Sequence, residues 1–391
     1  FSTAATSLSG LAMLKIDIYW DLRATIPERH TGVGQHVIEV LNGLRARSDV
    51  DLRVLLAKDQ VTLWQAQSQA HGWASLQVVV LPLSNKGNRL LYGITSMWSL
   101  DRICAGRDLV YAPMELILGL NRIPFVNTIH GIPYFEPSLT LKRYGSARYR
   151  WERIKQAWFL RRCRQRCRLS LSVSDYLKDQ LVNRFRFDPA DLYTVYNGAG
   201  EAFFGPPKTG SATPLKQRLR FLSVGGANAF DGGAALVQVA RVLQREMPEA
   251  ELWIAGDRHE QPWVGQLRAM DNVLWHGFLS SEHLAIEMQR ASALLYVPAV
   301  ESFGIIGVEA MALGLPIVAR QSTALPEVLA DAAVWIDPDN PASVIQGLKA
   351  VVEDEALREQ LIVKGRARAE RYRWSSVVTR VLKGFQQVVG D

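Results

Sequence analysis

Short apolar segments recur along the whole chain and alternate with longer segments whose apolar residues follow a helical period. In the first half the apolar segments are LKIDIYW, LRVLLA, LQVVVLP, LVYAP, PFVNTIH, LSLSVS and LYTVYNG. In the second half they are RFLSVGG, AELWIAG, NVLWHGF, ALLYVP, LPIVAR and AVWIDP. Nearly continuous apolar strands that alternate with helices are typical of parallel sheets covered by helices on both faces. The pattern therefore predicts an α/β protein with two doubly wound sheets.

A segment rich in proline, glycine, serine and threonine separates the two sets of predicted strands. It lies within FFGPPKTGSATPLKQR, residues 203 to 218, and its composition is typical of a linker. The chain of 391 residues also exceeds the length at which single cores usually stop growing. We therefore predict a first domain over 13 to 204, a linker over 205 to 218 and a second domain over 219 to 371. The amphipathic segment 372 to 391 is predicted to form a helix that packs back toward the first domain.

The composition, with 48% hydrophobic and 21% charged residues, is that of a core-forming protein. No apolar run approaches the roughly 18 residues that cross a bilayer, and the first dozen residues lack the basic start of a secretory signal. Cys163 and Cys167 supply two of the four ligands that a structural zinc needs, and three cysteines do not make a disulfide framework. We therefore expect a cytoplasmic protein with reduced thiols.

The decapeptide ESFGIIGVEA, residues 301 to 310, places Glu301 and Glu309 between a buried strand and a helix predicted to begin near Ile306. On a continuous helix their spacing corresponds to about 12 Å and a rotation of roughly 80°. This geometry argues against the acid/base pair of a glycosidase, whose carboxyl groups lie about 5 to 9.5 Å apart. Two separate contacts with one long polar ligand remain open, as do two ordinary solvated acids, which the spacing alone favours.

Two glycine-containing loops follow predicted strands. In TGVG, residues 31 to 34, backbone N–H groups can approach an anion at the start of a helix, although a tight turn explains the loop nearly as well. Neither this loop nor SVGGANAFDGG has the GxGxxG spacing. A nicotinamide dehydrogenase would therefore lack its usual motif.

Several strings of residues together resemble a known family. The E-x7-E pattern, followed by EAMALGLPIVAR and ALPEVLADAAVWIDP, closely resembles the retaining nucleotide-sugar glycosyltransferases of family 4, which have the GT-B fold. The strings TGVGQHVIEVLNGL, TIHGIPYFEP, SVSDYLKDQL and VYNGAGEAFF extend the likeness over nearly the whole chain, and the segment from 293 to 338 is its specific part. The order of motifs is most similar to bacterial enzymes that build O-antigen or exopolysaccharide chains, many of them mannosyltransferases. The implied architecture is GT-B, with two Rossmann-like domains facing across a cleft.

The resemblance also implies roles for individual residues. Glu301 would bind hydroxyls of the donor sugar, and His130 would reach the same sugar from the first domain, so these two are the catalytic candidates. A lone histidine at a strand end is more often structural, and the motif around His130 is what favours a role. Glu309 would bind the ribose hydroxyls, and Gly34 would approach the diphosphate or acceptor through its backbone. The remaining donor-binding candidates are Gly225, Gly226, Arg258, His276, Gly277, Phe278, Phe303, Gly304, Ile305 and Ile306.

The implied reaction transfers a hexose, of the mannose or glucose type, from a nucleotide diphosphate sugar to a glycan or lipid-linked acceptor with retention. The leaving phosphate oxygen would take the acceptor proton, so neither a protein nucleophile nor a cofactor is expected, and GDP-mannose is favoured over UDP-glucose. Asp49 with Asp51 and Asp337 with Asp339 have the DxD spacing of a metal site, but their positions at a strand entry and a strand-end turn predict structural roles and no metal. The alternative is a catalytically silent GT-B-like protein that binds nucleotide or sugar within a polysaccharide assembly.

The chain departs from the family at the first strand of the second domain. Family members usually carry an Arg and a Lys there, whereas this chain has Phe230 and Asp231. Removing groups that stabilise a leaving group typically costs a few kcal/mol of barrier. Either a helix N-terminus after Asp231 with Arg258 or another nearby basic residue replaces the pair, or the protein is a weakened or silent transferase. We favour replacement because Glu301, Glu309 and His130 are all present.

The net charge of +7 is concentrated between Arg148 and Arg168, where nine basic residues alternate with aromatic ones. A basic and aromatic helix suits an anionic membrane, to which each Lys or Arg adds about 1 kcal/mol. A solvated helix whose aromatic side chains enter the core is about equally expected. No recognised nucleic-acid module accompanies the charge, so we predict no nucleic-acid partner. Because the implied acceptors are often lipid-linked, we expect peripheral attachment to the inner face of the plasma membrane.

Overall fold

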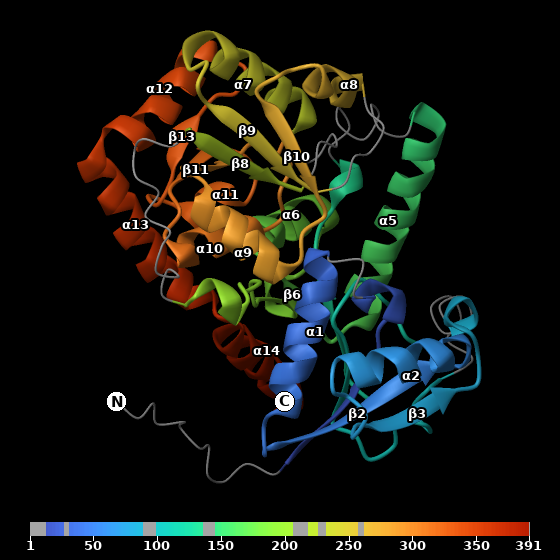
Figure 1. The fold of residues 1–391 in the computed structure, drawn as a ribbon. Helices are drawn as coiled ribbons and strands as arrows, with labels where there is room; N and C mark the ends of the chain where they lie inside the picture. The colour runs from blue at the N-terminus through green and yellow to red at the C-terminus, as the bar shows by residue number, and fades with distance from the viewer. Residues whose placement is uncertain are drawn as a thin grey trace.

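The computed structural model has two α/β domains, each built on one parallel sheet (Figure 1). Helices cover both faces of each sheet, and this arrangement confirms the predicted fold class. The structure describes residues 13–26, 31–88, 99–135, 145–205, 218–225, 232–256 and 262–390.

The first sheet has seven parallel strands in the order β3-β2-β1-β4-β5-β6-β7. Successive side chains on a strand point to opposite faces, so neighbouring residues enter different cores. Along β2, Leu52 and Val54 pack in the core that contains α1, whereas Leu55 lies in the core on the other face. The strands are β1 (Leu14–Ile18), β2 (Val50–Ala57), β3 (Gln77–Leu81), β4 (Leu109–Ala112), β5 (Phe125–Ile129), β6 (Leu169–Ser172) and β7 (Leu192–Thr194).

Two helices of the first domain, α1 and α6, begin at polar capping residues. Thr31 accepts the backbone N–H of Gly34 at the start of α1, and Ser174 accepts that of Leu177 at the start of α6. Such caps satisfy N–H groups that have no partner inside the helix. The α-helices are α1 (Gly32–Arg45), α2 (Val61–Ala70), α5 (Ser146–Arg166) and α6 (Asp175–Phe185). The 3-10 turns are η1 (Leu22–Thr25), η2 (Lys58–Gln60), η3 (Pro133–Phe135), η4 (Pro189–Asp191) and η5 (Glu201–Phe203).

The second sheet has six parallel strands in the order β10-β9-β8-β11-β12-β13. Its strands are β8 (Arg220–Val224), β9 (Glu251–Ala255), β10 (Val273–Gly277), β11 (Ala293–Tyr296), β12 (Ile317–Arg320) and β13 (Val334–Ile336). Its helices are α7 (Gly233–Glu246), α8 (Pro262–Arg268), α9 (Ser281–Arg290), α10 (Ile305–Leu313), α11 (Leu325–Leu329), α12 (Pro341–Glu353) and α13 (Glu355–Ala369), followed by η6 (Glu370–Tyr372). No helix in the described part of the chain is both long enough and apolar enough to cross a bilayer.

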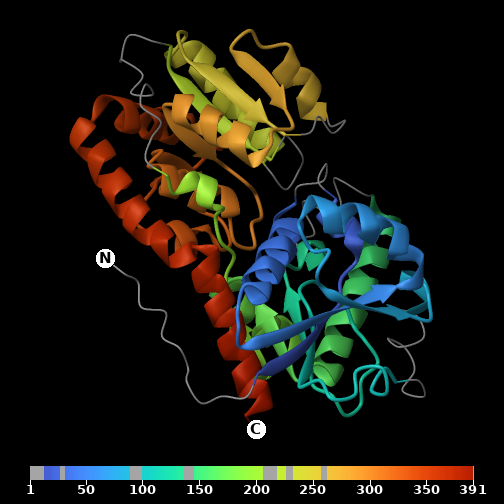
Figure 2. The same ribbon diagram turned by 60° about the horizontal axis from the view of Figure 1, so that its bottom comes forward.

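The last helix, α14 (Trp374–Val389), returns from the second domain to the first (Figure 2). Val377, Val381 and Phe385 of α14 lie in the same core as the apolar residues of α1 and β1. The contact between α1 and α14 is close, because a Cβ atom on Gly43 would lie 2.3 Å from the Val378 side chain. Apolar residues from the two ends of the chain therefore share the core of the first domain.

Candidate active site

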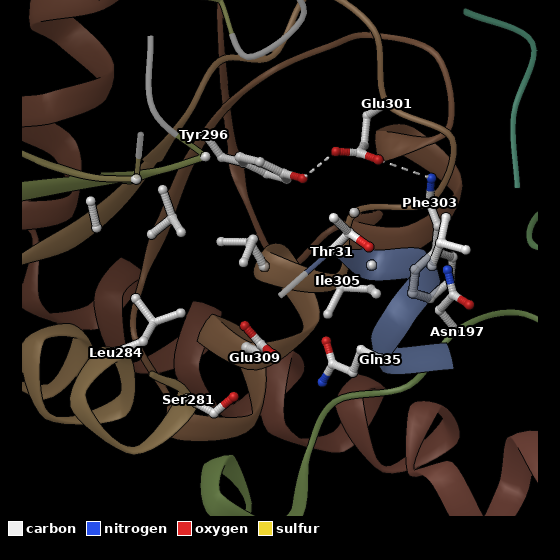
Figure 3. A pocket seen from close by; sticks show the side chains of 18 of the residues that line it. Thr31, Gln35, Asn197, Ser281, Leu284, Tyr296, Glu301, Phe303, Ile305 and Glu309 are labelled. Atoms are coloured by element: carbon white, nitrogen blue, oxygen red, sulfur yellow. Dashed lines mark hydrogen bonds between the residues drawn. The ribbon is translucent and has the colours of Figure 1, made fainter. Parts of the chain in front are cut away.

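One cavity of about 1070 Å3 is lined by residues of both domains (Figure 3). Its walls include residues at or just after the carboxyl ends of strands, where ligands of doubly wound sheets bind. His130 follows β5, Gly225 follows β8, and Tyr296 is the last residue of β11. From the first domain the lining contains Thr31, Gly32, Val33, Gln35, His130, Val173 and Asn197.

Two helix N-termini face this cavity from opposite sides. Gly32 and Val33 of α1 line it from the first domain, and Ile305 and Ile306 of α10 line it from the second. The first N–H groups of a helix lack partners inside the helix and favour a bound anion. Gly304, just before α10, has φ +102°, and a Cβ atom there would lie 2.8 Å from the Leu325 side chain, so the turn requires glycine.

Glu301 is held at the rim of the cavity by three hydrogen bonds to its carboxylate. The Tyr296 hydroxyl donates to Oε2 at 2.7 Å, and the backbone N–H groups of Ser302 and Phe303 donate to Oε1 at 3.0 and 3.3 Å. A carboxylate has about four lone-pair sites. These bonds leave one acceptor position, on Oε2, for a ligand hydroxyl.

Glu309 lies in the wall of the same cavity and is only 3% exposed. Its carboxyl faces Gln35 of α1 across the cavity, and its Oε2 atom has no protein partner (Figure 3). Burial raises the pKa of Glu309 to about 8, while the hydrogen bond from Gln35 lowers it. The solvated-acid alternative is therefore wrong for Glu309. The reason is that α10 is apolar all round and buried, as its sequence IIGVEAMAL indicates.

The buried carboxyl of Glu309 makes stability depend on pH. Its pKa is raised from 4.5 to about 8 on folding, so the unfolded chain loses this proton first and stability falls as pH rises through that window. Between about pH 6 and 8.5 the free energy of unfolding of the wild-type protein should fall by roughly 2–3 kcal/mol because of this residue. The Glu309→Gln variant should not show this fall. Urea unfolding at both pH values measures the difference. Equal losses in wild type and Glu309→Gln would contradict the assignment, and Glu353→Gln, an exposed acid on α12, is the control.

His130 lines the cavity and is oriented by the chain around it. Its Nε2 atom contacts the carbonyl oxygen of Pro113 at 3.0 Å, and its backbone N–H donates to the Glu115 carboxylate at 2.5 Å. Since Nε2 must carry a proton to donate to a carbonyl, the other ring nitrogen is the acceptor in the neutral ring. Sequence reasoning did not single out its neighbour His36, which packs edge-on against the His130 ring with centroids 4.8 Å apart.

His36 is a buried polar residue behind the cavity wall. Its Nδ1 atom lies 2.8 Å from Oδ1 of Asn197, which lines the cavity, and Nε2 lies 3.4 Å from the Tyr111 hydroxyl. Burial holds the pKa of His36 well below its usual value, with a smaller contribution from His130. Because Oδ1 of Asn197 can only accept, Nδ1 carries the single proton of the neutral His36 ring. The amide NH2 group of Asn197 therefore points away from His36.

Gly34 occupies a different position from the one expected. Gly32 and Val33 line the cavity, whereas Gly34 donates its N–H to Thr31 Oγ1 at 3.1 Å. A Cβ atom on Gly34 would lie 2.2 Å from the carbonyl oxygen of Ala24. The glycine is therefore needed for the close packing of α1 on η1 and does not contact the cavity itself.

Only some of the donor-binding candidates around β8, β9 and β10 lie at the cavity. Gly225, Gly256 and Phe278 line the cavity, but His276 and Gly277 do not. The His276 ring instead packs against Trp253 with centroids 4.7 Å apart. The predicted residues Gly226 and Arg258, and the departure at Phe230 and Asp231, lie outside the described residues. Among the other predicted residues, Phe303, Gly304, Ile305 and Ile306 all line the cavity.

Charge in this cavity comes from acids and helix ends. No Lys or Arg side chain lines it within the described ranges. The two DxD pairs lie elsewhere and make structural contacts. Asp49 pairs with Arg47 and Asp51 with Arg107, at 2.5 and 2.7 Å. Asp337 accepts the backbone N–H of Asp339 at 3.0 Å.

The two facing doubly wound domains and the shared cavity have the architecture of the GT-B fold. The sequence profile described as Glycosyltransferase Family 4 matches residues 30–200, and that described as Glycosyl transferases group 1 matches residues 212–368. Between them these profiles cover most of both domains. The chain belongs to the glycosyltransferases of family 4.

The names of two relatives describe mannosyltransferases. The chain is 23% identical to the O-antigen chain mannosyltransferase B of Escherichia coli, over 93% of this chain and 98% of that protein. It is 32% identical to the phosphatidyl-myo-inositol mannosyltransferase of Mycobacterium tuberculosis over 41% of this chain and 44% of that protein. The predicted similarity to O-antigen mannosyltransferases is confirmed.

Solved structures share the fold at low sequence identity. Sucrose-phosphate synthase from Thermosynechococcus elongatus has a TM-score of 0.71 at 15% identity and covers 96% of this chain and 99% of its own. The Anabaena protein HepE in complex with UDP and glucose has a TM-score of 0.65 at 15% identity, over 95% of this chain and 98% of its own. These likenesses establish the common two-domain architecture.

Proposed function

We propose that this chain is a retaining, metal-independent glycosyltransferase. It transfers mannose from GDP-mannose to a hydroxyl of a glycan or lipid-linked acceptor in polysaccharide synthesis. The observation that carries the proposal is that Glu301 and Glu309 line one cavity, each with an acceptor position left open. Mannose is chosen because the names of several relatives describe mannosyltransferases, and GDP is chosen over UDP as its carrier.

The two glutamates would contact different parts of the donor. Glu301 accepts a hydrogen bond from a hydroxyl of the sugar through the open position on Oε2, at the rim beside Tyr296. Glu309 accepts a hydrogen bond from a ribose hydroxyl through Oε2, in the wall formed by α10. The diphosphate lies between them at the start of α10. This arrangement is the two-contact alternative left open by the spacing of ESFGIIGVEA.

Leaving-group charge would be stabilised by oriented N–H groups. Each helix N-terminus carries roughly half a positive charge, and α1 and α10 both begin at the cavity. Preorganised donors of this kind act strongly in a site that excludes water. The leaving phosphate oxygen takes the proton of the acceptor hydroxyl, so the sugar is transferred on one face. Closure of the two domains on the donor excludes water from this step.

A second surface, on α5, is proposed to attach the enzyme to an anionic membrane. Trp151, Ile154 and Trp158 are 60%, 60% and 46% exposed, and their spacing puts them on one side of the helix. Figure 1 shows α5 on the outer side of the first domain. Basic residues border this stripe on the same helix, at positions 148, 150, 155, 161 and 162. Apolar side chains among basic ones fit the boundary between acyl chains and anionic headgroups.

A donor panel tests the proposed reaction. The protein is incubated with GDP- and UDP-sugars and glycan acceptors, and nucleoside diphosphate release is measured with and without a chelator. We expect nucleoside diphosphate release to be greatest with GDP-mannose plus acceptor and to be unchanged by the chelator. The new glycosidic bond of the product should have the anomeric configuration of the donor. Binding of nucleotide sugars without turnover would favour the silent-binder alternative. An inverted product would contradict the retaining mechanism.

A further inference from the structure

Thr323, in the loop after β12, has an unusual backbone conformation. Its φ of +43° lies in the left-handed region, where a β-branched side chain is a strong outlier. Strain of this kind persists where surrounding contacts impose it, and it gathers at active sites. Glycine would adopt this φ without strain but would bring no side chain. What threonine supplies at this position, and glycine would not, is a hydroxyl.

That hydroxyl binds both backbone groups of Glu301. It accepts the N–H of Glu301 at 2.8 Å and donates its proton to the carbonyl oxygen of Glu301 at 2.6 Å. A hydroxyl can donate one hydrogen bond and accept others, so the Thr323 side chain satisfies both backbone groups. Ser322 adds a bond from its hydroxyl to the carbonyl oxygen of Pro298 at 2.9 Å. The loop after β12 thus fastens the loop that carries Glu301.

Tyr296 holds the side chain of the same glutamate. The tyrosine is 5% exposed, and its hydroxyl donates to Glu301 Oε2 at 2.7 Å (Figure 3). Its ring lies against the start of α10, since a Cβ atom on Gly304 would be 3.4 Å from the tyrosine ring and hydroxyl. The ring therefore has little room to turn, and the bonded oxygen of Glu301 is kept in one place.

We propose that Thr323 and Tyr296 are positioning residues for the reaction, the first for the backbone of Glu301 and the second for its carboxylate. Together they direct the one open acceptor position of Glu301 toward the donor sugar. This inference rests on the proposed function, because it assumes that Glu301 binds the sugar. Neither residue needs to contact the donor.

Four variants test the inference. Thr323→Ser keeps the hydroxyl, Thr323→Ala removes it and keeps the left-handed backbone, and Thr323→Gly removes both the hydroxyl and the strain. Tyr296→Phe removes the hydroxyl that donates to the carboxylate of Glu301. We expect kcat to fall about 10-fold in the alanine, glycine and phenylalanine variants, the effect of losing a bond that orients a charged group. Thr323→Ser should stay within about threefold of wild type.

The melting temperature and nucleotide affinity separate positioning from folding. A positioning role predicts that Thr323→Gly keeps its Tm within about 4 °C of wild type and keeps the affinity for nucleoside diphosphate. A purely structural role predicts a lower Tm and a normal kcat in the folded protein. Wild-type kcat in both Thr323→Gly and Tyr296→Phe would overturn the inference.

A binding measurement distinguishes failure of this inference from failure of the proposed function. The affinity ratio between nucleotide sugar and nucleoside diphosphate isolates the contribution of the sugar. If the wild type shows a sugar contribution that both variants lose, the positioning roles stand whatever the acceptor. If the wild type neither turns over nor prefers any nucleotide sugar, the proposed function fails, and this inference fails with it.

Discussion

Replacing Glu301 with glutamine is expected to lower kcat by about 10²–10³-fold, with the affinity for nucleoside diphosphate within about threefold of wild type. Glutamine retains the shape of the side chain and a carbonyl oxygen for the N–H groups of Ser302 and Phe303. It loses the negative charge beside the sugar, which becomes positive as the bond to the leaving group breaks. The effect is therefore largest in the transition state and appears in kcat.

Steady-state kinetics with the best donor, together with calorimetry of nucleotide binding, measure the effect of Glu301→Gln. Glu353→Gln is the matched control, because Glu353 is an exposed acid on α12. Turnover equal to that of the wild type would defeat the assignment of Glu301. A loss of nucleotide affinity as large as the loss of kcat would mean that Glu301 organises the loop and does not act on the sugar.

Replacing the stripe of Trp151, Ile154 and Trp158 with serine is expected to weaken binding to anionic vesicles by at least about 10²-fold. Burial of each such side chain is worth about 1.5–3 kcal/mol, so partial insertion of three suffices for this change. Turnover of a water-soluble acceptor should stay within about twofold of wild type, because α5 residues do not line the cavity. Vesicle cosedimentation at physiological salt measures the first quantity.

The control for the stripe is Val363→Ser on α13, since Val363 is 68% exposed and lies in the second domain. Vesicles with and without anionic lipid separate the contribution of charge from that of apolar insertion. Equal binding by the wild type and the triple variant would remove the membrane proposal. Absence of wild-type binding to anionic vesicles would also remove it.

The fold was predictable because its signal is local. Each strand of both sheets is a short apolar run, so the two doubly wound sheets could be recognised segment by segment. The start of α10 was also close to its predicted place, with Ile305 as the first helical residue where a start near Ile306 was expected.

The residues that line the cavity were most fully predicted where they lie in one segment. Glu301, Glu309 and the residues between them come from a single strand-loop-helix unit. Contacts made across space carried no local signal, which is why Gln35 opposite Glu309 and Thr323 behind Glu301 were missed. The apolar character of α10 was a usable sign that Glu309 is buried. The packing reason for a glycine at position 34 was also missed, because its short distance to Ala24 depends on how two elements pack.

The return of α14 to the first domain has a consequence for biosynthesis. Phe385 and its neighbours on α14 complete a core whose other members, such as Ile16 and Val37, are made more than 300 residues earlier. At about 5–20 residues per second, the first domain waits on the order of 10–40 s on the ribosome for its last helix. During this interval the surface that receives α14 is open to water or to a chaperone. The domain that emerges first is therefore completed last.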